Sequence, residues 1–421
     1  MIKNDKSKLI YDIIIIGGGI GGLYSAYKIK NYSSETRFLI LEKSKRSDFG
    51  GRLGNYNFFG ESVVKGAGIG RIKKDILLKS LLDKLGLDSH KFIVSKKYAP
   101  NMASHICDIN YIHKLLCKKY KSKPLEWRQK TFKEFATKIL GKRTYRDFVL
   151  STGYQDYNNE DIEETLYKYG FDNTSSKIWT AFSVPWKELI EKLAFNIGIE
   201  YIKFNQDVIS FAKSRTNPEI FIIKNSNNQK YYAKKIIVAT TIQSVCKLFK
   251  SYPIYRNIGT NVFLRLYGKF AKSSINIMKE QISTTTIVKT PVQKIIPINR
   301  DKGIYMISYC DDKNAVGFTS YLENTPKNRK FWENELKKAL SLKNEVLKLL
   351  SIKAFYWPIG THYYKPLNPI YKTRENYVNI AQHPDDNILV VGEMISRKHG
   401  WTEGALESVE KVVTQKWLNV K

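Results

Sequence analysis

The hydrophobic pattern at the start of the chain changes from a continuous apolar run to a helical period and back again. Residues 12–16 form a short, β-branched apolar run, which is typical of a buried parallel strand. Glycines fill most of 17–22, apolar positions at helical spacing follow over 23–30, and residues 37–42 are mainly apolar again. The pattern predicts a strand–turn–helix–strand unit, which is how a parallel α/β sheet begins.

Helical and strand-like patterns alternate along the rest of the chain. Helical spacing of apolar residues occurs over 72–86, over much of 105–200 with its clearest piece at 186–194, and over 327–349. Strand-like runs occur within 201–238 around an Asn-rich hairpin turn, within 259–270 and within 292–310. A strand, a loop and a helix are predicted over 387–417. We expect Gly86 to end the helix at 72–86.

A glycine motif follows the first strand directly. Gly17, Gly19 and Gly22 have the spacing GxGxxG and lead into the predicted helix. In such a turn the first glycine permits the tight bend, the second lets the backbone approach a pyrophosphate, and the third allows close helix–strand packing. Glu42 ends the second strand, where a carboxylate can accept both ribose hydroxyls and disfavours a 2′-phosphate. The motif predicts a Rossmann-type domain that binds NAD or FAD, but it does not separate the two.

The order of the elements predicts two intimately joined domains of the α/β class, because a chain of 421 residues exceeds what one core usually serves. We expect a Rossmann-type dinucleotide-binding domain with a mostly parallel sheet, formed by residues 1–70, 196–250 and 375–421. Residues 71–195 and 251–374 are expected to form an α+β substrate-binding domain with a mixed sheet and helices.

The charge of the chain is strongly positive. There are 70 Lys and Arg residues against 39 Asp and Glu, which gives a net charge of +31. Such a surface is compatible with non-specific nucleic-acid contact. The lysines are spread along the whole chain without an arginine-rich tail, so amino-acid composition is the favoured explanation.

The N-terminus and the cysteines indicate an intracellular protein. The apolar run near the start is too short for a signal peptide or a membrane span. We therefore expect a cytoplasmic protein, or a virion protein if the gene belongs to a large DNA virus. The cysteines stand far apart in the sequence, with no CxxC pair and no spacing typical of a metal site, at Cys107, Cys117, Cys246 and Cys310.

Four segments together resemble the flavin-containing amine oxidase family, which includes monoamine, polyamine and L-amino-acid oxidases. They are GGGIGGL at 17–23, Glu42, GGR at 50–52, and VGE with HGWTEGALES at 391–408. The central stretch from 205 to 211, followed by KKIIVATT, matches the family more loosely. The resemblance implies FAD between a Rossmann domain and a substrate domain. It also implies non-covalent binding, because GTHYYKP at 360–366 lacks the cysteine that some members use for attachment.

The resemblance and the motifs together predict a set of cofactor-binding residues. The set consists of Gly17, Gly19, Ile20, Gly22, Glu42, Lys43, Gly51, Arg52, Gly68, Ile69, Gly70, Arg71, Val208, Gly392, Glu393, Gly400, Trp401, Thr402 and Ala405. The residues from Gly400 to Ala405 open the last helix, whose N-terminal amides can face the flavin N1/O2 edge. Negative charge accumulates there on reduction, so a helix N-terminus would stabilise the reduced flavin.

The resemblance also provides candidates for the substrate-binding residues. Arg71 resembles the L-amino-acid oxidase arginine that holds the substrate carboxylate, although a surface or flavin-phosphate role fits it equally. Trp401 stands where the family has one aromatic wall of the active site. The other wall is expected from a loop over 357–366, which contains the candidates His362, Tyr363 and Tyr364.

The family resemblance implies an oxidation in which hydride passes from the amine-bearing carbon to flavin N5. The imine hydrolyses and dioxygen reoxidises the flavin to give hydrogen peroxide. Many members have a lysine that holds a water beside N5, but GTNVFLRLY carries Asn261 at that place. Lys294 is the other candidate for that role. The partners expected are an amine or amino-acid substrate and dioxygen, and a homodimer is compatible with the pattern.

Two other functions fit the same scaffold. One is a desaturase or protoporphyrinogen-oxidase-like enzyme that uses the flavin on a non-amine substrate. The other is a catalytically weak FAD-binding protein whose basic surface contacts nucleic acid, which Asn261 and the net charge favour slightly.

Overall fold

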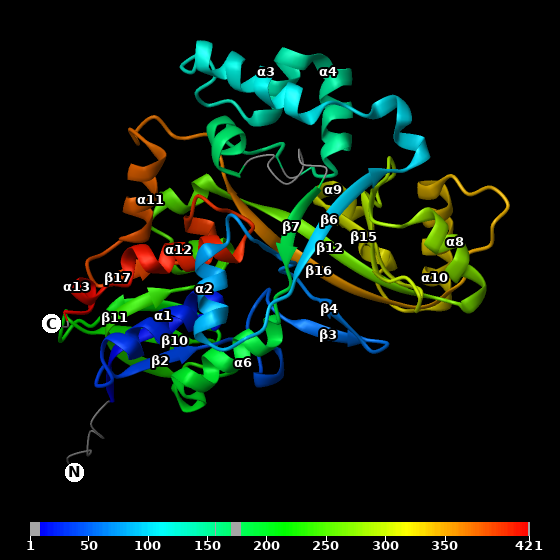
Figure 1. Cartoon of the computed structure of the whole chain (residues 1–421). Helices are drawn as coiled ribbons and strands as arrows, with labels where there is room; N and C mark the ends of the chain where they lie inside the picture. Colours follow the sequence, from blue (N-terminus) through cyan, green and yellow to red (C-terminus); the bar gives the residue numbers. More distant parts are fainter. Residues whose placement is uncertain (1–8, 156, 170–177, 420–421) are drawn as a thin grey trace.

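The computed structural model of the chain describes residues 9–155, 157–169 and 178–419. Two large sheets lie side by side, and a group of helices covers one end of the second sheet (Figure 1). The predicted α/β class, with a Rossmann-type part and a second part with a mixed sheet, is confirmed.

The first sheet is the dinucleotide-binding sheet. Its strand order is β8 (Ile202–Lys203), β2 (Phe38–Leu41), β1 (Ile10–Ile16), β11 (Lys230–Val238), β10 (Phe221–Asn225) and β9 (Val208–Lys213), and β17 (Ile388–Val390) also pairs with β11. Strand β1 is parallel to both β2 and β11, with Ile13 opposite Phe38 and Lys235. Strands β9 and β10 form the antiparallel extension of the sheet. Three distant parts of the chain therefore build one sheet.

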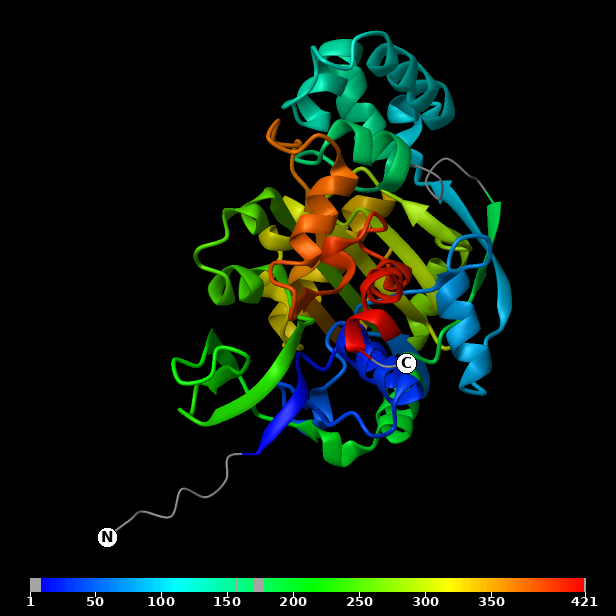
Figure 2. The ribbon, with the colours of Figure 1, turned by 90° about the vertical axis from the view of Figure 1, so that its left-hand side faces the viewer.

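Helices cover both faces of this sheet, as the uninterrupted apolar run of β1 requires. Ile13 and Ile15 face a core formed with α1 (Ile20–Tyr32), α2 (Ile76–Lys84), α6 (Trp186–Ile197) and α12 (Thr402–Val412). Ile14 and Ile16 face the opposite core, formed with α7 (Ile242–Leu248) and α11 (Arg374–Gln382). Figure 2 shows α12, near the C-terminus, beside the N-terminal helix α1.

The second sheet is mainly antiparallel. Its order is β16 (Leu349–Tyr364), β12 (Ile258–Phe270), β15 (Ile304–Asp311), β14 (Lys294–Asn299), β13 (Thr285–Ile287), β6 (Lys91–Tyr98), β7 (Ile178–Phe182) and β5 (Gly70–Arg71). Leu264 and Leu266 of β12 face a core that includes α8 (Lys272–Gln281) and α10 (Pro326–Leu340). Their neighbours on the strand point the other way, because side chains alternate between the faces of a sheet. The residues of β12 that face away from that core, Phe263, Arg265 and Tyr267, line the cavity described below.

The remaining elements complete the second part of the molecule. The helical group at the top of Figure 1 consists of α3 (Ile109–Ser122), α4 (Phe132–Thr152) and a π-helical turn (Glu164–Tyr169), which share a core of their own. A separate hairpin is formed by β3 (Asn55–Phe58) and β4 (Glu61–Val64). The short helices α9 (Asp312–Gly317) and α13 (Gln415–Leu418) follow β15 and α12.

Several predicted boundaries are wrong. The helix predicted over 327–349 ends at Leu340, because Ser341 adopts a left-handed conformation, and residues 349–364 form a long strand where a loop was expected from 357. Strands β6 and β7 were not predicted. The helix predicted from residue 72 begins at Ile76, and Ile76 itself is exposed while Leu78 is buried. Gly86 follows its end with a positive φ of 66°, as expected.

The boundaries of the two domains remain a prediction, but the packing of two helices bears on the segment 71–195. Helices α2 and α6 pack against the dinucleotide-binding sheet, although they lie within 71–195. Within the described ranges, no helix is both long and apolar enough to cross a bilayer.

Candidate functional site

A single cavity of about 1200 Å³ runs from the glycine turn of the first sheet to the open face of the second sheet. Its volume exceeds the ~300–1,000 Å³ of ordinary ligand pockets, so it has room for a dinucleotide and a second molecule. We call the part beside Gly17 and Gly19 the glycine end. The part lined by β6 and β12–β16 is called the sheet end.

The glycine turn has the geometry that the motif predicts. Gly17 has a φ of +108°, and a Cβ on Gly22 would lie 1.9 Å from the Gly17 carbonyl oxygen, so these two positions require glycine. A Cβ on Gly19 would meet nothing within 4 Å and would project into open space at the N-terminus of α1. The backbone around Gly19 therefore leaves a cradle in which a phosphate can approach the helix N-terminus.

Glu42 is held in place beside this cradle. Its Oε2 accepts a hydrogen bond from the Gly18 amide at 2.6 Å, and its Oε1 accepts one from the Ser44 amide at 2.7 Å. The side chain is 7 % exposed and lines the cavity. Each carboxylate oxygen keeps further lone pairs, so Glu42 can accept from the hydroxyls of a ribose.

Glu393 is the centre of a buried charged cluster at the middle of the cavity. Its carboxylate accepts hydrogen bonds from Arg52 Nη1 at 2.7 Å, from the Gly400 amide at 3.0 Å and from His362 Nδ1. Burial alone would raise the pKa of Glu393, but His362, Arg52 and His399 together hold it below its ordinary value. Glu393 therefore stays ionised and fixes the Arg52 guanidinium at the cavity wall.

His362 is buried and forms a hydrogen bond with Glu393. It is 1 % exposed, and its Nε2 accepts a hydrogen bond from the Ile242 amide at 3.2 Å. An accepting Nε2 requires the proton on Nδ1, which donates to Glu393. Burial lowers the pKa of His362, so the ring is neutral near pH 7.

The start of α12 forms one wall of the cavity. Trp401, Thr402 and Ala405 line it. The carboxylate of Glu403 points away from the cavity and accepts from the Leu77 and Leu78 amides at 3.0 and 2.9 Å, so it caps α2. The first turns of two helices are thereby tied together at this wall.

Arg71 lines the cavity but is already paired. Its Nη2 lies 2.6 Å from Oδ1 of Asp75, its Nε lies 3.1 Å from the same oxygen, and its side chain is only 9 % exposed. The ring of Trp401 covers the guanidinium at 3.6 Å. Asp75 therefore compensates the charge of Arg71, for which binding of a substrate carboxylate was one of the roles that the sequence left open.

The sheet end is aromatic and cationic. Tyr309 of β15 packs edge-on against Tyr154 at 6.0 Å and lies 5.7 Å from Phe263 of β12. Arg265 lies over the Tyr309 ring at 4.3 Å, and Lys294 lies over the same ring at 4.4 Å. Trp357 and Lys96 also line this end of the cavity.

The buried carboxylate of Asp311 lies behind Lys294, outside the lining. Burial raises the pKa of Asp311 to about 6, while hydrogen bonds from Gln293 and the Gln155 amide and the charge of Lys294 counteract this rise. Burial also lowers the pKa of Lys96 to about 8. Both groups are therefore mainly charged at neutral pH.

The structure brings most of the predicted residues to one cavity. Those in its lining are Gly17, Gly19, Ile20, Glu42, Lys43, Gly51, Arg52, Gly68, Ile69, Arg71, Val208, Lys294, Gly392, Glu393, Gly400, Trp401, Thr402 and Ala405. Gly22 and Gly70 lie behind the lining and act through packing. An added Cβ on Gly70 would lie 2.1 Å from the Phe182 ring.

Four predicted residues of the substrate side are not in the lining, and their assignment is corrected. His362 lies behind Glu393, and Tyr364 is fully buried against Tyr377 in the core of the first sheet. Asn261 and Tyr363 are buried where β12 pairs with β16. Residues 357–361 line the cavity, whereas 362–364 continue as a strand that pairs with Ile258–Thr260 and is buried there.

Sequence reasoning missed Arg265, Lys96, Tyr154 and Tyr309. Three lining residues stand at alternate positions of one predicted strand: Phe263, Arg265 and Tyr267. This alternation was the available signal, because the opposite face of the strand is purely apolar at Leu264 and Leu266.

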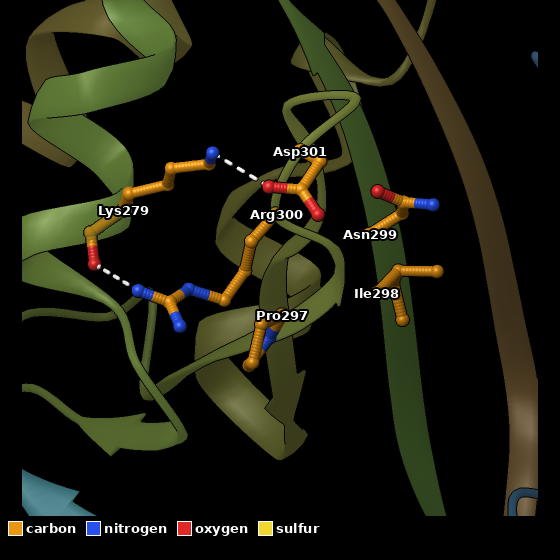
Figure 3. A pocket seen from close by; sticks show the side chains of 6 residues that line it. All are labelled: Lys279, Pro297, Ile298, Asn299, Arg300 and Asp301. Carbon is orange, nitrogen blue, oxygen red and sulfur yellow. Dashed lines mark hydrogen bonds and ion pairs between the residues drawn. The ribbon is translucent and has the colours of Figure 1, made fainter.

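A second hollow is lined by Lys279 of α8 and by residues 297–301 at the end of β14, and Figure 3 shows its side chains. Lys279 Nζ pairs with Asp301 at 2.6 Å, and Arg300 donates to the Lys279 carbonyl oxygen. Its charged groups bind one another or the backbone, which argues against a ligand site here.

Comparison with solved structures identifies the architecture. A putrescine oxidase structure superposes with a TM-score of 0.76 at 12 % identity, covering 98 % of this chain and all of that chain. The wild-type putrescine oxidase with bound putrescine matches equally well, over 96 % of this chain. The chain has the amine oxidase fold. The family resemblance drawn from the sequence motifs is thus confirmed at the level of the fold.

Sequence comparisons agree with the dinucleotide-binding part of this amine oxidase fold. The model of the NAD(P)-binding Rossmann-like domain matches residues 15–85. An uncharacterized protein of Acanthamoeba polyphaga mimivirus is 21 % identical over 98 % of this chain and 95 % of its own length. A probable malate:quinone oxidoreductase of Campylobacter jejuni is 24 % identical over 54 % of this chain and 49 % of its own length.

Proposed function

We propose that this chain is an FAD-dependent oxidase of amines or amino acids. The observation that carries the proposal is the continuous cavity, which joins a dinucleotide cradle to an aromatic chamber in the second sheet. A hydride acceptor bound at one end would therefore face a substrate held at the other. The putrescine oxidase structures, which share this fold, support the proposal.

The residues present fit non-covalently bound FAD. The cradle at Gly19 would accept the pyrophosphate, and Glu42 would accept hydrogen bonds from the adenosine ribose. Arg52, fixed by Glu393, and the first amides of α12 would face the remainder of the cofactor. No cysteine belongs to the lining among the described residues, which fits non-covalent binding.

The protein itself would mainly bind and shield the substrate. Bound FAD would supply the redox chemistry by accepting a hydride from the amine-bearing carbon and passing the electrons to dioxygen, which gives hydrogen peroxide. Tyr154, Tyr309 and Phe263 would exclude water and contact the substrate. Lys294 lies among these rings and stays the candidate for a residue that positions water.

The test begins with the purified protein. Its absorption spectrum should show bound flavin, or the protein should take up FAD when the cofactor is added. Anaerobic mixing with pools of amines and amino acids should then bleach the flavin band, and air should restore it with release of hydrogen peroxide. A colourless protein that cannot take up FAD during refolding would contradict the proposal.

A non-amine substrate is the second candidate, because the Campylobacter jejuni relative is named as a probable malate:quinone oxidoreductase. The same anaerobic experiment with hydroxy acids distinguishes the two candidates. Bleaching by malate or a related hydroxy acid, with none by amines, would favour this candidate.

A further inference from the structure

The cationic groups of the sheet end show what kind of substrate the cavity can hold. Among the described residues that line this end, Lys96, Arg265 and Lys294 are cationic and none is acidic. A diamine would bring a second ammonium group into this part of the cavity, where it would meet charges of its own sign. Like charges at close distance in a partly dehydrated site repel strongly.

The arginines of the cavity differ in whether a carboxylate already binds them. Arg52 is paired with Glu393 at 2.7 Å, and Arg71 is paired with Asp75 at 2.6 Å. Within the described residues, Arg265 has no carboxylate within ion-pair distance. Its interactions are with the Tyr309 ring, the Tyr267 hydroxyl and the Met306 sulfur, whose distance from Nη1 is 3.9 Å. An arginine whose charge is not compensated at a partly buried wall favours an anionic ligand.

The position of Arg265 places its guanidinium between the two ends of the cavity. Its side chain starts from the middle of β12, and its Nη2 lies 3.2 Å from the position of a Cβ built on Gly68. Gly68 belongs to the segment 66–71, which lines the cavity beside the paired Arg71. A ligand in the aromatic chamber would therefore pass within reach of Arg265.

We infer that Arg265, with Lys96 of β6 in the lining of the same cavity, binds a carboxylate of the substrate. The cavity would then select amino-acid-like or other carboxylate-bearing molecules over diamines. This inference rests on the proposed function and assigns the carboxylate to Arg265 in place of Arg71. Lys294 contributes less, because Asp311 behind it compensates its charge.

The test uses the FAD-loaded protein and a matched pair of ligands, 4-phenylbutanoate and its uncharged amide. The two have nearly the same shape, only the acid is charged, and neither is an amine, so binding can be measured from the change in the flavin absorption band without turnover. We expect the acid to bind the wild-type protein at least about 10-fold more tightly than the amide, which is ~1.4 kcal/mol. Equal binding of the two ligands would overturn the inference.

Variants then locate the anion-binding group. Arg265→Gln should reduce the acid-to-amide ratio to near one and leave binding of the amide unchanged, whereas Arg265→Lys should keep part of the preference. Arg215→Gln removes an exposed arginine outside the cavity and should leave the ratio at its wild-type value. A ratio unaffected by Arg265→Gln, or a loss of FAD affinity with an unchanged ratio, would show that Arg265 does not bind the carboxylate.

The two proposals fail in different ways. Absence of FAD binding by the wild-type protein would contradict the proposed function itself. FAD binding and amine oxidation with no preference for carboxylates would leave the proposed function standing and remove only this inference.

Discussion

The glycines of the GxGxxG motif could be predicted from the sequence, because the need for glycine at these positions arises from nearby atoms. The steric need at Gly17 and Gly22 depends on atoms a few residues away in sequence or on the strand alongside. The partners of Arg71 and His362 were not predictable in this way. Asp75 stands only four residues from Arg71, but nothing in the sequence indicates that it turns back to the guanidinium. Glu393 is brought to His362 only by the folded sheets.

Gly19 and Gly22 should respond differently to the same substitution. Gly19→Ala places its methyl group in open space and should leave the stability of the apoprotein unchanged, while FAD binding weakens because the phosphate cradle is filled. Gly22→Ala should destabilise the fold, because its Cβ would lie 1.9 Å from a carbonyl oxygen. Thermal unfolding of the apoprotein and FAD titration measure the two effects. Wild-type FAD affinity in Gly19→Ala would contradict the assignment of the cradle.

The charge of Glu393 should make stability depend on pH. Because its pKa in the folded protein lies below the ordinary value of 4.5, its contribution to stability is present above pH ~4.5 and is lost as the pH falls further. Glu393→Gln should lower the free energy of unfolding at pH 7 by about 3 kcal/mol, because Arg52 and His362 lose their buried partner. Urea denaturation of both proteins should show this difference shrinking towards acid pH. A difference independent of pH would contradict the prediction.

Helices and strands with a continuous apolar pattern were predicted well. Elements whose ends are set by contacts with distant parts of the chain were not. The β1–α1–β2 unit has both its period and its turn in the sequence. Strand β16 contains Pro358 and Gly360, which favour a loop, and its pairing with β12 is irregular there, but pairing on both sides of this point keeps the strand continuous over sixteen residues. Tertiary pairing before and after this irregularity therefore decides the strand, and the aromatic loop that the sequence predicted does not form.

The cap that α12 provides for α2 is testable as an interaction between elements. Glu403→Ala removes the acceptor of the Leu77 and Leu78 amides and should lower the free energy of unfolding by about 1–2 kcal/mol. Lys411→Ala, on the exposed side of the same helix, is the matched control and should change it by less than ~0.5 kcal/mol. Chemical denaturation of both variants measures the difference, and an equal effect would indicate that the cap contributes nothing.

At the scale of the whole molecule, the sequence predicted the α/β class and the meeting of both chain ends in one sheet, since each end carries its own motif. It did not predict how the second sheet closes the cavity, because that arrangement depends on β6 and β7, which lack a clear strand pattern. Nucleic-acid contact through the +31 surface and a homodimer remain predictions.

FAD should stabilise the whole molecule, because the cavity is lined by both sheets. At a free concentration of one hundred times its Kd, it should add about 2.7 kcal/mol to the free energy of unfolding. Thermal unfolding with and without FAD measures the shift, and ADP serves as a control that reaches only the glycine end. An unchanged unfolding temperature in saturating FAD would contradict the assignment of the cavity.

The pairing of β17 with β11 has a consequence for biosynthesis. While the ribosome is still adding the segment that forms β17 and α12, the residues of the glycine turn are already synthesised but Glu393 and Trp401 are not. We therefore expect the cofactor to bind only after this late segment emerges. Until then the edge of β11 at 236–238 lacks its partner strand, and an unpaired edge is where pairing with another chain can begin.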